Sequence, residues 1–502
     1  MAHKLPMSPY ADLEARFHRL QALRNALGML HWDMATMMPA GGAEARAEQL
    51  AALNVVCHGM LTEPVMVDLL DHAEGGAASL DDWQRANLRE MRRQWIHATA
   101  LDAKLVEALS KACSSCEQIW RDARPKGDFA MILPALTEVL RLVREAAAAK
   151  SARLGVSAYD ALLDEYEPDG RSAEIDRVFG DLADFLPGLL ARVLEHQARQ
   201  PAPIDLPGPF PVEKQRNLGE QIMRTLGFEF EHGRLDTSLH PFCGGMPDDV
   251  RITTRYAEDD FALAVMGVIH ETGHALYERG LPRQWRHQPV GLARGMSLHE
   301  SQSLLMEMQA CRSAPFIAFL APVAREVFGG NGPAWEAENF RRVYTHVKPD
   351  FIRVEADEVT YPAHVILRYR LEKALIGGDM KLTDLPGAWN EGMKKLLGIV
   401  PPSDREGCLQ DIHWYDGAWG YFPTYTLGAM TAAQLFDAAC RANPDIPGAI
   451  GEGNFAPLLA WLRTNVHGQG SRLPARDLLT AATGRPLDPA VFKAHLERRY
   501  LN

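Results

Sequence analysis

Two histidines one helical turn apart, His270 and His274, are the feature that most restricts how this chain can fold. On a helix their imidazoles lie on one face and can both reach a single Zn²⁺ at roughly 2.0–2.1 Å. Apolar residues surround the pair and predict a buried or half-buried helix: Phe261, Leu263, Val265, Met266, Val268, Ile269 and Leu276. The rest of the chain is then expected to serve as a scaffold for this helix.

The residue after the first histidine, Glu271, completes a His-Glu-x-x-His pattern. It lies close enough to accept a proton from an activated water without being a ligand. A catalytic zinc usually has a third protein ligand, and Glu300 is our prediction for it. It follows a loop rich in Arg, Pro and Gly and opens a second predicted helix. On that helix His299 points about 100° away, and Glu307 lies about two turns further on, too far to share the ion.

The remaining pattern predicts a mostly α-helical protein. Amphipathic segments such as 13–30, 43–56 and 133–154 predict successive helices, which polar and aromatic residues interrupt at 30–39. A Pro-rich run at 201–211 predicts the boundary between an N-terminal helical half, residues 1–200, and a catalytic half, residues 201–502. We expect the first half to form a wall or lid of the substrate groove, and the two halves to make one continuous structural unit.

Only the region from Arg234 to Tyr256 predicts strands, because Val250, Ile252 and Thr254 alternate with polar residues. A small antiparallel hairpin or sheet beside the metal helix fits this pattern. Its edge could bind an extended peptide through backbone hydrogen bonds. We therefore expect proline near the scissile bond to impair turnover.

Composition restricts the partners and the compartment. The net charge of -12 argues against nucleic acid or an anionic membrane surface as the main partner. Seven scattered cysteines are too few for a disulfide framework and favour a reducing cytosol. The segment Met1–Tyr10 lacks the apolar core of a signal peptide, and no apolar run has the length of a membrane span. We therefore expect a cytoplasmic protein.

Two later segments carry further candidate residues. Arg353 and Asp357 are spaced as an i,i+4 pair, so a helix-surface ion pair competes with a role of Arg353 in substrate binding. The segment from Gly407 to Tyr425 concentrates aromatic and polar groups, which is typical of cleft walls.

Several separated motifs together resemble the Taq-type metallocarboxypeptidases, the thermostable carboxypeptidase 1 group of zinc peptidases. The matching pieces span most of the chain: His240–Phe242, Asp249–Thr253, His270–His274, His299–Gln302, Ile352–Asp357 and Gly407–Trp414. The resemblance implies a helical subunit with a deep groove, similar to neurolysin and angiotensin-converting enzyme, and a homodimer. It also implies zinc held by His270, His274 and Glu300, and removal of single C-terminal residues from peptides with broad side-chain tolerance.

Roles follow for the candidate residues. Glu271 is expected to act as the general base, and His413 and Tyr421 to donate hydrogen bonds to the oxyanion. An exopeptidase acting at the C-terminus must bind a free carboxylate, for which we expect Arg353 first and Arg251 second. His240, from the first matching motif, is a further candidate for substrate binding. Asp249 or Asp357 could orient the ligand histidines.

Three points stay open on the sequence alone. An endo-oligopeptidase on the same scaffold would share the metal and the base, and a peptide-binding protein without activity could retain the fold. Glu271 argues against the second alternative, because a structural zinc has no use for an acid beside its ligands. Zinc is the expected ion, but a site of two histidines and one glutamate also accepts cobalt or manganese.

Overall fold

Helices make up 71% of the chain in the computed structural model, which describes residues 8–502. Residues 1–7, part of the segment in which we expect no signal peptide, lie outside the described residues. The N-terminal helices are α1 Pro9–Thr36, α2 Ala43–Thr62, α3 Val65–Gly75, α4 Asp82–Thr99, α5 Ala103–Lys126, α6 Phe129–Leu154, α7 Ala158–Leu163, α8 Ser172–Ala198 and α9 Val212–Leu226.

The remaining helices follow the three strands in sequence. They are α10 Phe261–Gly280, α11 Gly295–Leu304, α12 Ala314–Phe328, α13 Ala337–Tyr344, α14 Tyr361–Gly377, α15 Leu385–Leu397, α16 Pro423–Ala442, α17 Ile446–Gly451, α18 Ala456–Asn465, α19 Ala475–Thr483 and α20 Pro489–Leu501. A π-helix, Leu305–Cys311, continues α11 directly. Such wide turns are rare and frequently occur at functional sites.

The predicted interruption after residue 30 is wrong in its position, because α1 continues through Trp32 to Thr36. The Trp32 ring is buried, and the guanidinium groups of Arg234 and Arg251 lie over it at 5.2 and 4.5 Å from its centroid. These cation–π contacts give the ring a favourable polar environment within the helix. They also join the first helix of the chain to the sheet.

The strands lie where the sequence predicts them, and the sheet has one strand more than the predicted hairpin. Strands β1 Gly233–Thr237, β2 Cys243–Met246 and β3 Asp249–Thr254 form one sheet in the order β1-β3-β2. The pair β2–β3 is the antiparallel hairpin that the alternation predicts, whereas β1 adds in parallel to β3. The sheet buries Val250 and Ile252 in a cluster that also contains Val268 of α10, so it packs against the helix with the two histidines.

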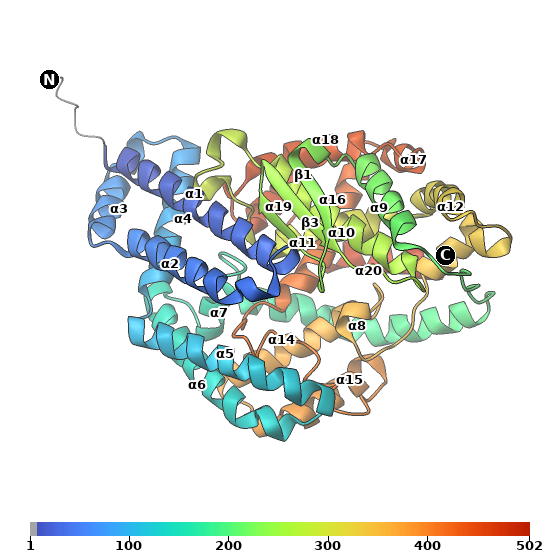
Figure 1. Cartoon of the computed structure of the whole chain (residues 1–502), viewed down its shortest axis with the longest axis horizontal. Helices are drawn as coiled ribbons and strands as arrows, with labels where there is room; N and C mark the ends of the chain where they lie inside the picture. Colours follow the sequence, from blue (N-terminus) through green and yellow to red (C-terminus); the bar gives the residue numbers. More distant parts are fainter. Residues whose placement is uncertain (1–7) are drawn as a thin grey trace.

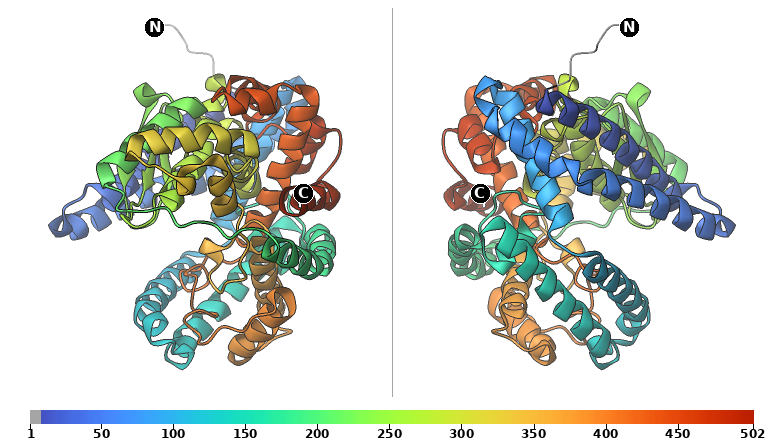
Figure 2. Two further views of the ribbon diagram at one scale, coloured as in Figure 1. Left: turned by 90° about the vertical axis from the view of Figure 1, so that its right-hand side faces the viewer. Right: turned by 90° about the vertical axis from the view of Figure 1, so that its left-hand side faces the viewer.

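Two lobes are visible in the side views (Figure 2). Helices α5 and α6 lie beside α14 and α15 in the lower lobe, although about 200 residues separate the two pairs in sequence. The upper lobe contains α1 to α4, the sheet and α10 (Figure 1). The largest buried cluster takes residues from both sides of the Pro-rich segment, from Cys116 to Tyr500.

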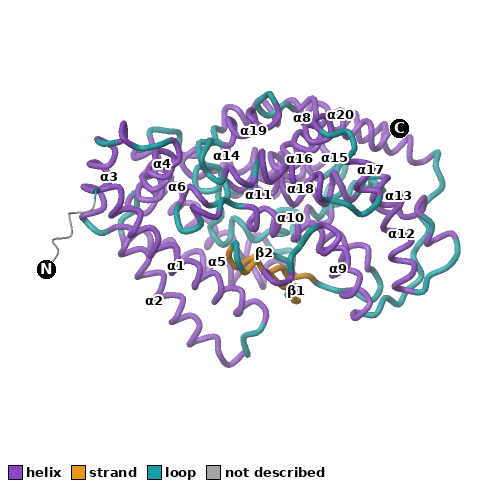
Figure 3. The backbone as a smooth tube through the Cα atoms, turned by 90° about the horizontal axis from the view of Figure 1, so that it is seen from above, coloured by secondary structure: helices purple, strands orange, loops and turns teal. Residues whose placement is uncertain are grey.

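Helices α10, α11 and α16 lie in the middle of the molecule (Figure 3). Helix α11 packs along both α10 and α16. Within the described residues no single helix is long and apolar enough to cross a membrane; the bent pair of 40–62 and 65–75 passes that test together, by length and composition alone.

Candidate metal centre and substrate-anchoring cluster

Helix α10 brings His270 and His274 to one face, as the spacing predicts. Its first turn is fixed by Asp260, whose carboxylate accepts hydrogen bonds from the backbone N–H groups of Ala262 and Leu263. Thirteen of its residues are buried, so the helix lies in the interior. This placement is what holds two imidazoles in a fixed orientation.

The beginning of α11 is held by a loop from the N-terminal half. The Glu167 carboxylate accepts a hydrogen bond from the backbone N–H of Ser297 (3.0 Å), and the Tyr166 carbonyl accepts one from Met296 (2.7 Å). Arg294, which is 1% exposed, donates to both Glu90 and Asp169 at 2.6 and 2.5 Å. These contacts fix the orientation of the helix that carries Glu300.

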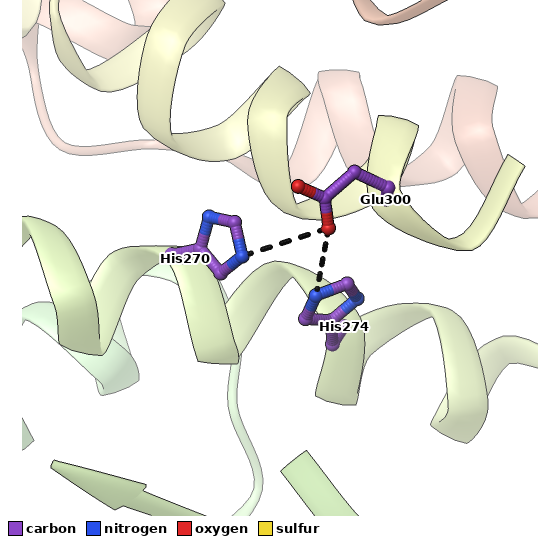
Figure 4. A group of neighbouring side chains, drawn as sticks. All are labelled: His270, His274 and Glu300. Atoms are coloured by element: carbon purple, nitrogen blue, oxygen red, sulfur yellow. Dashed lines mark ion pairs between the residues drawn. The ribbon is translucent and has the colours of Figure 1, made fainter. Parts of the chain in front are cut away.

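The three predicted ligands meet between these helices (Figure 4). Oε2 of Glu300 lies 3.7 Å from Nε2 of His270 and 3.4 Å from Nε2 of His274. Ligand atoms at roughly 2.0–2.2 Å from a tetrahedral zinc are separated by about 3.3 Å, which is close to both values. The donor set therefore fits a zinc-type ion with one open position.

Each of the two candidate ligand histidines has an orienting partner that we did not predict. Nδ1 of His270 lies 2.9 Å from Oε2 of Glu307, whose other oxygen accepts a hydrogen bond from Arg312 at 2.7 Å. An imidazole that binds a metal through Nε2 is neutral and carries its proton on Nδ1, so His270 donates to Glu307. The π-helix brings Glu307 to this position. Glu307 thus contacts the far side of the candidate ligand His270.

His274 is oriented by a relay through a second imidazole. Its Nδ1 lies 2.7 Å from Nδ1 of His299, and Nε2 of His299 lies 2.8 Å from Glu278. Donation from His274 to His299 and from His299 to Glu278 satisfies all of these atoms with one set of tautomers. Asp249 and Asp357, our predicted orienting residues, are wrong for this role. Asp249 pairs with Arg251, and Asp357 accepts backbone N–H groups, including that of Lys348.

Glu307 gives the first testable prediction. We expect Glu307→Gln to weaken metal affinity by about 10- to 100-fold, because the amide keeps the shape but removes the charge that makes His270 a better ligand. Competition with a chromophoric chelator measures the affinity, and the exposed Glu326→Gln serves as the control. Equal affinities of both variants and the wild type would contradict an orienting role of Glu307.

The two ligand histidines differ in their electrostatic environment. Burial works to lower the pKa of His270, but the carboxylates of Glu300 and Glu307 outweigh it and raise that pKa to about 10. Burial lowers the pKa of His274 to about 4. Burial also raises the pKa of Glu271 to about 7, and this side chain is only 7% exposed. A carboxyl group with a pKa near neutrality is well suited to exchange protons during catalysis.

A second prediction follows for metal loading. Below pH 10 both ring nitrogens of His270 are protonated in the apo enzyme, whereas a histidine that binds a metal must be a neutral imidazole. Metal binding at pH 8 should therefore release about one proton, and affinity should rise with pH up to that pKa. Titration calorimetry in buffers of different ionisation enthalpy measures the released proton. Heats that are the same in all buffers would contradict this expectation.

Of the two alternatives for Arg353, the helix-surface ion pair with Asp357 does not form, and the reason is structural. Arg353 lies in a short 3-10 turn, Arg353–Glu355, instead of a helix, and α14 begins only at Tyr361. Arg353 pairs with Asp411, 58 positions away, with Nη2 to Oδ1 at 2.8 Å. The guanidinium lies 4.5 Å from the ring centroid of Tyr425. The whole Arg353 residue is only 5% exposed. This is a buried, prearranged cation, unlike a helix-surface pair.

The aromatic segment from Gly407 to Tyr425 surrounds the same guanidinium of Arg353. Nε2 of His413 lies 3.1 Å from the hydroxyl of Tyr425, and the rings of His413 and Tyr421 are 5.6 Å apart. Burial raises the pKa of Tyr421, and Tyr425 and the metal-ligand candidate Glu300 add to this increase. The aromatic cluster therefore lies within electrostatic reach of the candidate metal site. Sequence reasoning missed the contact of Tyr425, which lies in the first turn of α16 with its ring centroid 5.2 Å from that of Tyr421, just before the helix.

The other two candidates lie on the side of the sheet. Arg251 is held by Asp249 and Trp32, and His240 is exposed in the loop before β2. Strand β2 nevertheless borders the site, because it packs against α10. Burial and the charge of Glu271 raise the pKa of the Cys243 thiol. No contact among the described residues joins His240 or Arg251 to Arg353.

Comparisons with known proteins identify relatives of this chain. A family model described as carboxypeptidase Taq (M32) metallopeptidase matches residues 12–500. Thermostable carboxypeptidase 1 of Thermus thermophilus is 40% identical over 506 residues, 99% of each chain, and carboxypeptidase 1 of Bacillus subtilis is 33% identical over 96% of each chain. The solved structure of Trypanosoma cruzi metallocarboxypeptidase 1 is similar with a TM-score of 0.97 at 42% identity, covering 99% of this chain and 100% of that one.

Proposed function

Because the chain belongs to the carboxypeptidase Taq (M32) metallopeptidase family and is therefore a metallocarboxypeptidase, we propose that it uses zinc to remove single residues from the C-termini of peptides. The observation that carries this proposal is the group of His270, His274 and Glu300 beside the buried Glu271. The buried Arg353 supplies the cation that a free C-terminus requires.

The residues of this chain divide the chemistry between them. His270, His274 and Glu300 would hold the ion, which when bound would polarise the attacking water and the scissile carbonyl. Glu271 accepts the proton of the water and passes it to the leaving amine. The reaction is a general-base hydrolysis without a covalent intermediate. Cobalt or manganese can replace zinc at such a donor set.

His413 and Tyr421 are the proposed donors to the oxyanion. Burial lowers the pKa of His413 to about 4, so the imidazole is neutral and can donate from one nitrogen only. Its Nε2 is within hydrogen-bond distance of the hydroxyl of Tyr425, so the imidazole and the phenol orient each other. Proposed contacts further along the peptide come from Arg251 and His240 beside the sheet, where an extended substrate can pair with a strand edge and where proline is unfavourable.

We also propose a compartment, a class of partner and an assembly for the enzyme. The seven cysteines are free thiols in the structure, which is compatible with the cytoplasm. We propose peptides as the only class of partner, a homodimer as the assembly, and no function at membranes or nucleic acids, in keeping with the net charge of -12.

The position of cleavage tests this proposal. An N-acetylated peptide with a free C-terminus should lose single residues stepwise in mass spectra, whereas the same peptide with a free N-terminus and a C-terminal amide should be turned over only slowly. Internal cuts in either peptide would instead favour the endo-oligopeptidase. No cleavage by the metal-loaded enzyme would favour a peptide-binding protein.

A further inference from the structure

The proposed anchor Arg353 does not stand alone, because a second arginine shares its carboxylate. Nε of Arg368 donates to Oδ2 of Asp411 at 2.6 Å, while Arg353 donates to Oδ1 of the same side chain at 2.8 Å. Arg368 is 0% exposed and lies 4.5 Å from the ring centroid of Trp389. The arrangement is therefore two buried guanidinium groups on one carboxylate, whose side chain is 11% exposed.

The charges of this cluster do not balance. Asp411 is the single carboxylate within 4 Å of either guanidinium among the described residues. The polar neighbours are uncharged: His413 and His364 are both neutral, because burial lowers their pKa values to about 4 and about 3. The tyrosines around Arg353 are neutral as well, because burial raises their pKa values. One positive charge stays uncompensated in a mostly dry environment.

Such an arrangement is costly for a purely structural residue. Burial opposes the charge of Arg368 and lowers its pKa to about 10, although Nε and Nη2 both lie 2.6 Å from Oδ2 of Asp411. An apolar side chain packed against Trp389 would avoid this cost. An uncompensated buried cation is instead expected where a ligand supplies the opposite charge.

We propose that Arg368 determines the specificity for a free C-terminus by supplying the net positive charge that Asp411 removes from Arg353. The inference rests on the proposed function of Arg353 as the anchor. Asp411 fixes the orientation of Arg353 but also neutralises it, so Arg353 and Asp411 together would attract a carboxylate little better than an amide. With Arg368 the cluster carries one net positive charge, and the terminal carboxylate of the substrate completes a set of two cations and two anions. Arg368 touches no substrate and acts through this charge and through Asp411.

The variants that test this inference change the net charge step by step. Arg368→Gln leaves zero net charge, Arg368→Lys keeps one positive charge, and the double variant Arg368→Gln with Asp411→Asn also restores one. The readout is the ratio of kcat/KM for a peptide with a free C-terminus to kcat/KM for its C-terminal amide, together with the inhibition constant of a free amino acid. Thermal melting checks folding, and Arg368→Met, which fills the space beside Trp389, replaces the glutamine variant if that variant unfolds.

We expect Arg368→Gln to lower the acid-to-amide ratio on the order of 30-fold, as for the loss of one unit charge in a partly dry site. Arg368→Lys should retain most of the ratio, and the double variant should recover it. A structural role predicts the opposite for the double variant, namely a further loss. Equal loss of activity on the acid and the amide in Arg368→Gln, or a double variant below the single one, would overturn the inference.

A parallel Arg353→Gln variant separates this inference from the proposed function. An unchanged acid-to-amide ratio in Arg353→Gln would refute Arg353 as the anchor and with it the premise. A ratio that falls in Arg353→Gln but not in Arg368→Gln would refute the role of Arg368 alone.

Discussion

Replacing Glu271 with glutamine is expected to lower kcat/KM by about 10³-fold or more, as for the loss of a general base, while the enzyme still binds one equivalent of metal. Glutamine has the shape of glutamate but cannot accept the proton of the attacking water. Glu271 is buried beside the ligand histidines without belonging to the ligand group. Steady-state kinetics and metal analysis of the same preparation measure both parts of the prediction.

The matched control lies on the same helix. Glu278 reaches His274 only through His299 and its side chain is 26% exposed, so Glu278→Gln should retain activity within about tenfold. Full activity of Glu271→Gln would contradict the proposed mechanism. Loss of metal from that variant would instead make Glu271 a ligand.

Replacing Arg353 with glutamine should lower kcat/KM for peptides with a free C-terminus by about 10²- to 10³-fold, because a buried charge pair with the substrate carboxylate is lost. Turnover of amidated peptides, slow in the wild type, should change little. Kinetics on an acid and amide pair with the same sequence measure the difference.

Arg251→Gln is the control for the Arg353→Gln variant. It removes an arginine that is held by Asp249 and Trp32 on the side of the sheet, so both substrates should be affected alike. A selective loss of the free-acid substrate in Arg251→Gln, without one in Arg353→Gln, would move the anchor to the sheet.

Local patterns predicted the helical class of the fold and several of its elements. The spacing of apolar residues predicted α10, and the alternation around Val250 predicted the β2–β3 hairpin. The parallel partner β1 was not predictable in this way, because a parallel pairing is made by contacts across the intervening chain. The continuation of α1 through Trp32 was missed because its stabilising arginines lie more than 200 positions further on.

The same distinction holds for the site. His270 and His274 are one turn apart, so their convergence follows from helix geometry. Arg353 and Asp411 are 58 positions apart, and the nearer Asp357 was a plausible but wrong partner on sequence grounds. Glu307 was judged by its distance to the ion alone, although its contact is with the far side of His270. Orienting partners depend on tertiary packing and leave little local signal.

Anomalous diffraction from crystals of the zinc-loaded enzyme, recorded on both sides of the zinc absorption edge, would show which residues bind the ion. We predict one strong zinc peak per chain at roughly 2.0–2.2 Å from Nε2 of His270, Nε2 of His274 and Oε2 of Glu300. A peak bound by other residues, or no peak between α10 and α11 in an active preparation, would contradict it.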